Sequence, residues 1–98
     1  MRVAAIRIEM HIGSAQSLKE KRSVLRPMIE GLRRSISASV AEVDHQNTWQ
    51  RAAIGVALVA SEASHLDSLV DRVRRHFDSG LDAEMVGFTV TYMEAPGE

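Results

Sequence analysis

The stretch that decides the fold is VAAIRIEMHI, residues 3–12, in which apolar side chains stand at every second position. The apolar positions on one face are Ala4, Ile6, Ile8, Met10 and Ile12. A period of two is typical of a β-strand that buries one of its faces. Gly13 ends the run, so the chain is predicted to begin with a half-buried strand.

A helix is predicted directly after this strand. Ser17 stands three residues before Glu20, a capping-box pattern in which both side chains bond backbone N–H groups at the helix start. Apolar residues then recur at roughly helical spacing over residues 18–36. Pro27 lies inside this run and should kink the helix unless its regular part begins only at Ser23; we expect one helix with a bend.

Two more strand signals follow, one irregular and one regular. Val40 and Val43 do not fit one alternation within residues 37–43, which predicts a bulge or one outward-facing valine. Residues 44–48 are rich in Asp and Asn and predict a turn. Residues 51–60 alternate cleanly and predict a strand.

The last part of the chain predicts a second helix and a last strand. The strand covers residues 84–93, with Val86 and Phe88 on the same face. The helix carries an apolar stripe at helical spacing: Leu66, Leu69, Val70, Val73 and Phe77.

The resulting order is β-α-β-β-α-β, which predicts an α+β, ferredoxin-like fold. In this plan a four-stranded antiparallel sheet carries both helices on one face, with the first and third strands in the middle. The chain has 98 residues, which suits one domain with one modest core. We therefore expect residues 1–98 to form a single ferredoxin-like domain.

Composition excludes several classes of protein. The formal net charge is -1, which argues against a protein that coats nucleic acid nonspecifically, and no DNA partner is expected. Cysteine is absent from the sequence, so disulfides and thiolate metal sites are excluded. No apolar run is long enough to span a bilayer, and no signal peptide is recognisable. We expect a cytoplasmic protein with no membrane partner, no cofactor and no metal.

Two marked stretches are predicted to meet at one edge of the sheet. They are SLKEKR, residues 17–22, and VAEVDHQNTWQRA, residues 40–52. The first helix starts at this edge, where free backbone N–H groups favour anions. The only tryptophan, Trp49, is read as a lid over the core in preference to a recognition aromatic. The predicted anion- or RNA-binding residues are Lys19, Lys21, Arg22, His45, Trp49, Gln50 and Arg51.

The same two stretches resemble the YlxP-like family of small bacterial proteins, a domain of unknown function. The resemblance covers nearly the whole chain, and it implies a ferredoxin-like fold. It supplies no established activity and no catalytic residues. Members of the family often lie in operons with translation initiation factor and ribosome-maturation genes, so the resemblance implies a role near the ribosome or RNA.

Three classes of function remain, in this order. The first is a non-enzymatic RNA- or ribosome-associated binding module. The second is a homodimeric scaffold or regulator that binds a small anion and associates through the open sheet face. That face offers small residues with few charges: Ala53, Gly55, Ala57, Gly87 and Thr89. The third is an enzyme that uses His11, Asp44 and His45, although no nucleophile elbow or phosphate-binding loop supports it.

Overall fold

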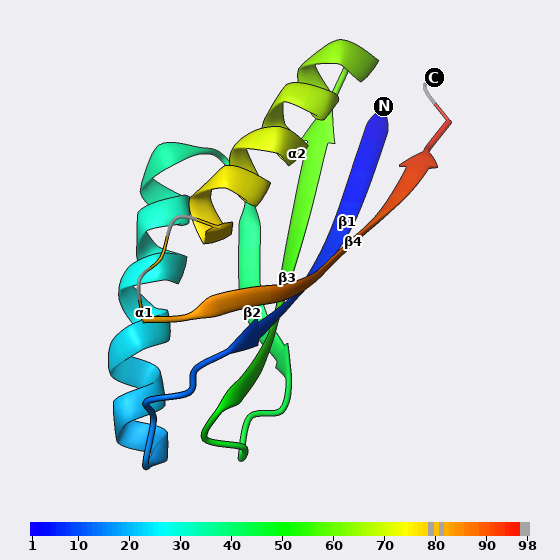
Figure 1. Cartoon of the computed structure of the whole chain (residues 1–98). Helices are drawn as coiled ribbons and strands as arrows, with labels where there is room; N and C mark the ends of the chain where they lie inside the picture. The colour runs from blue at the N-terminus through cyan, green and yellow to red at the C-terminus, as the bar shows by residue number, and fades with distance from the viewer. Residues whose placement is uncertain (79, 81, 97–98) are drawn as a thin grey trace.

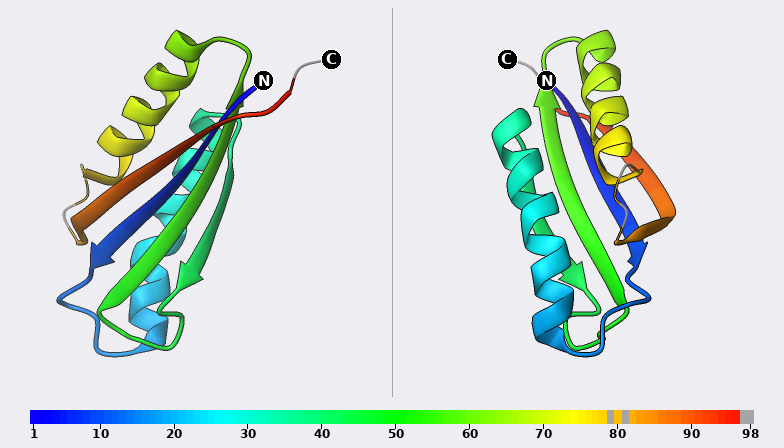
Figure 2. Two further views of the ribbon diagram at one scale, coloured as in Figure 1. Left: turned by 90° about the vertical axis from the view of Figure 1, so that its right-hand side faces the viewer. Right: turned by 60° about the vertical axis from the view of Figure 1, so that its left-hand side comes forward.

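The computed structural model describes residues 1–78, 80 and 82–96. It confirms the predicted order and fold class, with four antiparallel strands in the order β2-β3-β1-β4. Both helices cover the same face of the sheet (Figures 1 and 2). The elements are β1 (Arg2–His11), α1 (Leu18–Ser35), β2 (Ser39–Asp44), β3 (Arg51–Ala60), α2 (Ala63–Asp78) and β4 (Glu84–Glu94).

The core lies between the sheet and the helices. It is filled by the apolar residues that the alternation and the helical spacing predict to be buried. The alternate apolar residues of β1 are all buried, as are Ile54, Val56 and Leu58 of β3. The α2 stripe packs against them, with Leu69 partly buried at its margin and the other members fully buried. None of the described helices is long and apolar enough to cross a membrane.

The start of α1 follows the capping prediction with one change. Ser17 is the N-cap, and its Oγ accepts the backbone N–H of Glu20 at 3.1 Å. The carboxylate of Glu20 accepts the N–H of Gln16 at 2.6 Å, one residue before the N-cap. The helix is continuous from Leu18 and contains Pro27 in its interior, so a start at Ser23 is wrong.

A bulge interrupts β2, and Val43 is its extra residue. Glu42 pairs with Ile54 and Asp44 pairs with Ala53, which leaves Val43 between them. Its side chain is 48% exposed, so both predicted alternatives hold: there is a bulge, and a valine faces outward. Val43 lies over Gly55, where an added Cβ would come within 2.7 Å of the valine Cγ1.

A second bulge changes the facing of β4, and it was not predicted. Glu9 pairs with Gly87 and Met10 with Met85, so the residue between them, Val86, has no partner on β1. Val86 is 60% exposed, whereas Met85 packs against the core together with Phe88. The prediction that Val86 shares a face with Phe88 is therefore wrong, because the bulge reverses the alternation there.

The predicted meeting point is confirmed at what we call the loop end of the sheet, which carries residues 12–17 and 45–50. At this end β1 and β2 stop, β3 and β4 begin, and α1 starts (Figure 1). His11, the last residue of β1, pairs with Arg51 on one side and Glu84 on the other. Residues far apart in the sequence thus come together as the topology requires.

Candidate functional site

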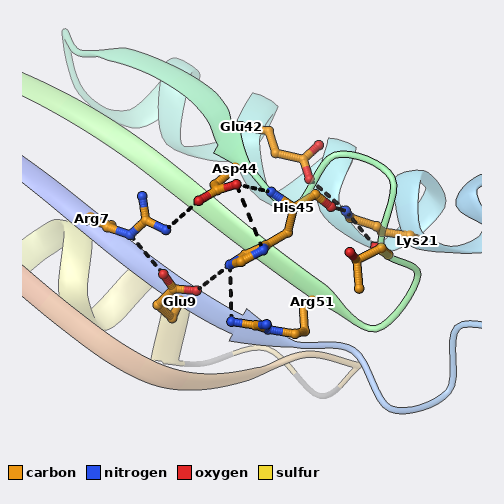
Figure 3. A network of polar contacts seen from close by, with 8 residues as sticks. Arg7, Glu9, Lys21, Glu42, Asp44, His45 and Arg51 are labelled. Carbon is orange, nitrogen blue, oxygen red and sulfur yellow. Dashed lines mark hydrogen bonds and ion pairs between the residues drawn. The ribbon is translucent and has the colours of Figure 1, made fainter.

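Lys21 lies at the centre of the loop end, and it is buried. Its side chain is 1% exposed, and its Nζ reaches the carbonyl oxygens of His45 at 2.7 Å and Thr48 at 2.9 Å. The third contact is an ion pair with Glu42 Oε2 at 2.7 Å (Figure 3). The ammonium group thus donates two hydrogen bonds and lies beside a carboxylate, whose Oε2 is buried and makes an ion pair but no hydrogen bond with the residues that the structure describes. The expectation that Lys21 offers its charge to solvent is wrong.

Gln50 makes a second link between the loops. Its side-chain nitrogen donates to the carbonyl oxygens of Gly13 at 3.1 Å and Ala15 at 3.2 Å. Its own backbone carbonyl accepts the N–H of Ile12 at 2.9 Å. Together Gln50 and Lys21 tie residues 45–50 to the β1–α1 loop and to the first turn of α1. We call this set of contacts the loop clamp.

The turn that carries His45 has an uncommon backbone conformation. His45 has a φ of 61°, in the left-handed region that few residues other than glycine adopt. Asp44 Oδ1 accepts the N–H of His45 at 2.8 Å, and the carbonyl of His45 accepts the N–H of Thr48 at 3.0 Å. The Lys21 ammonium on the same carbonyl helps to hold this conformation.

The side chain of His45 joins a polar network on the open sheet face, opposite the helices. Arg7 bridges Glu9 at 2.8 Å and Asp44 at 3.1 Å. His45 Nε2 lies 3.4 Å from Glu9 Oε2 and 3.2 Å from Arg51 Nη2 (Figure 3). Two of the predicted anion-binding residues, His45 and Arg51, therefore contact each other.

The network also shifts the acid–base properties of its members. The backbone N–H of His45, and then the guanidinium of Arg7, lower the pKa of Asp44 below its ordinary value. Hydrogen bonds to Asp44 and Glu9 raise the pKa of Arg7 above its ordinary value.

The network also covers the sheet beneath it. Ala53, which pairs with both Glu9 and Asp44, is 0% exposed. This part of the open face is therefore covered by the chain's own side chains.

The remaining predicted residues stay accessible. Lys19, Arg22 and Arg51 are exposed. Trp49 is 50% exposed, so it is not the buried lid that the sequence favours. Its indole N–H makes no hydrogen bond with the residues that the structure describes.

The predicted binding residues left out one member of this accessible group, Arg26, although it belongs to the basic run at the start of the helix. Lys19, Arg22 and Arg26 recur at i, i+3 and i+7, the spacing that places side chains on one stripe of a helix. They line a shallow hollow on α1 with Ser23 and Pro27. We call these three residues the cation stripe, and the spacing itself was the signal for the third.

A groove continues from the cation stripe to the edge strand β2. Arg22 and Arg26 line it beside the apolar side chains of Leu25 and Ile29. Further along, Arg33 pairs with Glu30 at 3.1 Å, and its guanidinium donates to the carbonyl of Val40 in β2. The groove therefore carries Arg22 and Arg26, unpaired among the described residues, together with two carboxylates, Glu30 and Glu42, that are already paired with Arg33 and Lys21.

The geometry gives little support to hydrolytic chemistry. Asp44 Oδ1 lies 3.9 Å from the His45 ring Nδ1 and bonds the backbone N–H of His45 at 2.8 Å. The other ring nitrogen faces Arg51 and Glu9. His11 lines a separate hollow with Asp78 and Glu84. Within residues 1–78, 80 and 82–96, no group of three or more His, Cys, Asp or Glu side chains is placed to hold a metal ion.

Comparison with known proteins agrees with the fold and defines the family. Uncharacterized protein YlxP of Bacillus subtilis (strain 168) is 37% identical over 71 residues, which cover 72% of this chain and 77% of that protein. The de novo designed protein Foldit4 has a similar fold, with a TM-score of 0.50 and 18% identity, over 97% of this chain and 98% of the design. The family model described as a protein of unknown function, DUF503, matches residues 3–90. The chain therefore belongs to the DUF503 family.

Proposed function

We propose that this protein is a non-enzymatic module that binds RNA, free or on the ribosome, through the cation stripe. The observation that carries the proposal is the state of the three side chains. Lys19, Arg22 and Arg26 are exposed, and none has an ion-pair partner among the described residues. Neighbouring cations on the same helix, Lys21 and Arg33, are both paired.

The position of the stripe adds to its attraction for anions. It begins with Lys19 in the first turn of α1, where the helix dipole favours negative charge. From Lys19 to Arg26 the helix rises about 10 Å, so the charges form a line rather than a point. A line of unpaired cations suits a chain of phosphates better than a single small anion.

A polyanion fits the neighbouring groove better than an added peptide strand does. Strand addition needs a free edge of some length. β2 has only 6 residues, its ladder is interrupted by the Val43 bulge, and Arg33 already occupies the carbonyl of Val40. These features disfavour the addition of a peptide strand to β2. Arg22 and Arg26, which line the groove beside it, are therefore free to contact a polyanion.

The net charge of -1 sets how strong such binding would be. A stripe of three cations on a nearly neutral protein gives local attraction without a general affinity for nucleic acid. Each contact with a phosphate of a single strand contributes about -0.7 to the slope of log affinity against log salt. Three contacts predict a slope of about -2.

The test is RNA binding measured by filter retention or anisotropy over a series of salt concentrations. The double substitution Arg22→Gln/Arg26→Gln should weaken binding and reduce the slope to about -0.7, since one stripe contact remains. The control is Arg34→Gln/Arg75→Gln, which removes the same net charge from exposed positions outside the stripe, one of which, Arg75, pairs with Asp71 at 3.2 Å. Equal binding by the two double variants would contradict the proposal.

A second candidate, a homodimeric scaffold, rests on the other half of the open face. Val3 pairs with Val59 on β3 and Met93 on β4, and these two neighbours are each 59% exposed. This apolar row lies away from the polar network and is not covered by it. Sedimentation equilibrium should show a dimer that Ala57→Lys, in the next row, converts to a monomer. A parent protein that is monomeric at high concentration would end this candidate.

A further inference from the structure

The backbone on both sides of Trp49 is held in place. Before it, the carbonyl of Thr48 accepts a hydrogen bond from the buried Lys21 at 2.9 Å, and its N–H donates to His45 at 3.0 Å. After it, Gln50 is bonded through its backbone to Ile12 and through its side chain to the β1–α1 loop. The loop clamp thus fixes the residue between its two attachment points.

The side chain that this backbone carries is left half in solvent. Trp49 is 50% exposed, although it is the only tryptophan of the chain. Burial of a large aromatic surface is favourable, and about half of the Trp49 surface is still exposed in the folded chain. A held backbone with an exposed ring loses little conformational entropy when a partner covers the ring.

Among the residues that the structure describes, no second Phe, Tyr or Trp is placed beside Trp49 to make a longer platform. Phe77 is fully buried, and Phe88 lies under the guanidinium of Arg74, which is 4.2 Å from its ring centroid. Tyr92 is exposed but pairs with Ala4, towards the far end of β1 from the loops. One exposed ring at the loop end offers a stacking surface for one base.

The ring and the cation stripe belong to the same end of the molecule. Lys21 bonds the loop residue next to Trp49, while Lys19 and Arg22 occupy the same turn of α1. The loop and this first turn lie together in both views (Figure 2). A strand that follows the stripe towards Lys19 reaches the end of α1 that the loop contacts, and its next nucleotides could continue to the ring.

We infer that Trp49 stacks on one unpaired base of a single-stranded RNA whose phosphates contact Lys19, Arg22 and Arg26. This inference rests on the proposed function and adds the kind of RNA and the residue that contacts the base. The strand must be single because bases in a duplex are stacked on each other and do not offer a face to a side chain. Stacking tolerates any base, so binding should show only modest sequence preference.

The experiment uses the fluorescence of the single tryptophan of the parent protein. Single-stranded RNA of about eight nucleotides should quench the emission and protect the ring from acrylamide. A blunt RNA duplex of the same length should bind more weakly and leave the emission unchanged. Labelled RNA then allows anisotropy measurements on variants: Trp49→Ala should lower affinity about five-fold to a hundred-fold, and Trp49→Phe should recover most of it.

The outcomes separate this inference from the proposed function. Salt-dependent binding without any change in emission, or with equal affinity of Trp49→Ala, would overturn the inference and leave the proposed function intact. Equal quenching by duplex and single strand would also overturn it. Absence of RNA binding by the parent at low salt would overturn both. If Trp49→Ala does not fold, the quenching and acrylamide measurements on the parent still decide.

Discussion

The first two turns of α1 carry a buried, paired cation on one side and, on the other, exposed cations without an ion-pair partner among the described residues. On the inner side, Lys21 is 1% exposed, donates to two loop carbonyls and forms an ion pair with a carboxylate. On the outer side, Arg22 is its neighbour in the sequence, is exposed and has no ion-pair partner in the described part of the chain. The comparison shows that a basic run in a sequence can combine a structural cation with binding cations.

The two sides also differ in how they affect free energy. Moving an ammonium group out of water is unfavourable, and it is tolerated only when acceptors replace the lost hydration. Lys21 has these acceptors, so its removal takes the cation away from the Glu42 carboxylate and from the Thr48 carbonyl and leaves the His45 carbonyl with the Thr48 N–H alone. An exposed arginine contributes little to folding, because solvent screens its charge. Stability should therefore depend on the inner side, and binding of anions on the outer side.

The largest expected effect comes from Lys21→Ala. The substitution leaves Glu42 and the carbonyls of His45 and Thr48 without the ammonium that they share. Loss of one partner of a buried ion pair costs about 3–5 kcal/mol. Urea denaturation should show this decrease in the free energy of unfolding, whereas the control Arg22→Ala should change it by less than about 0.5 kcal/mol. Similar stabilities of the two variants would remove the distinction between the two sides.

A smaller effect is expected at the other contact of the loop clamp. Gln50→Ala removes two hydrogen bonds, to the carbonyls of Gly13 and Ala15. Each bond contributes about 0.5–1.5 kcal/mol, so the free energy of unfolding should fall by about 1–3 kcal/mol. The neighbouring exposed residue Gln46 provides the control, as Gln46→Ala removes the same side chain without these bonds. A Gln50 variant as stable as the Gln46 variant would show that the β1–α1 loop is held by other contacts.

The fold could be predicted from the sequence because its signals are periodic. The alternation of Ile6, Ile8 and Met10 requires one buried face, and the element order allows few topologies. Val86 shows the limit of that reasoning. A bulge adds one residue to β4 and reverses the facing on one side of it, and nothing in the local alternation marks its position.

The accessible part of the site was predicted better than its buried part. The meeting of SLKEKR with the loop followed from topology alone. The burial of Lys21 depends on where the loop carbonyls of His45 and Thr48 point, which a sequence does not show. One signal was present: Lys21 stands four residues before Leu25, on the apolar stripe of the helix. Charge alone led to its interpretation as a binding residue.

The polar network of the open face also lay outside sequence reasoning. Alternation along residues 3–12 puts Arg7 and Glu9 on the face opposite the buried apolar residues. Their contacts with Asp44 and His45 depend on the bulge in β2 and on the positive φ of His45. As a result, the face is less open at the loop end than its small residues predict, and an additional partner is not needed to cover Ala53.

The smallest expected effect tests whether this network belongs to the structural side or the binding side. The pKa of Asp44 is lowered by the His45 N–H and by Arg7. In the unfolded chain an aspartate titrates near its ordinary pKa of about 3.9. A group with a lowered pKa in the folded state adds stability above that value, and the contribution is lost as the pH falls through the folded-state pKa. Asp44→Asn should therefore lower the Tm slightly near neutral pH, and the difference from the parent should disappear in acid.

Circular dichroism melts between about pH 6 and about pH 2 measure this difference, with Asp67→Asn as the control for the loss of one exposed carboxylate. RNA binding by Asp44→Asn should match the parent, since the substitution leaves the cation stripe intact. A Tm difference that stays constant across the pH range would show that the carboxylate of Asp44 gains no stability from its charged partners. A loss of RNA binding at unchanged Tm would instead move Asp44 and Arg7 from the structural part of the loop end to its binding surface.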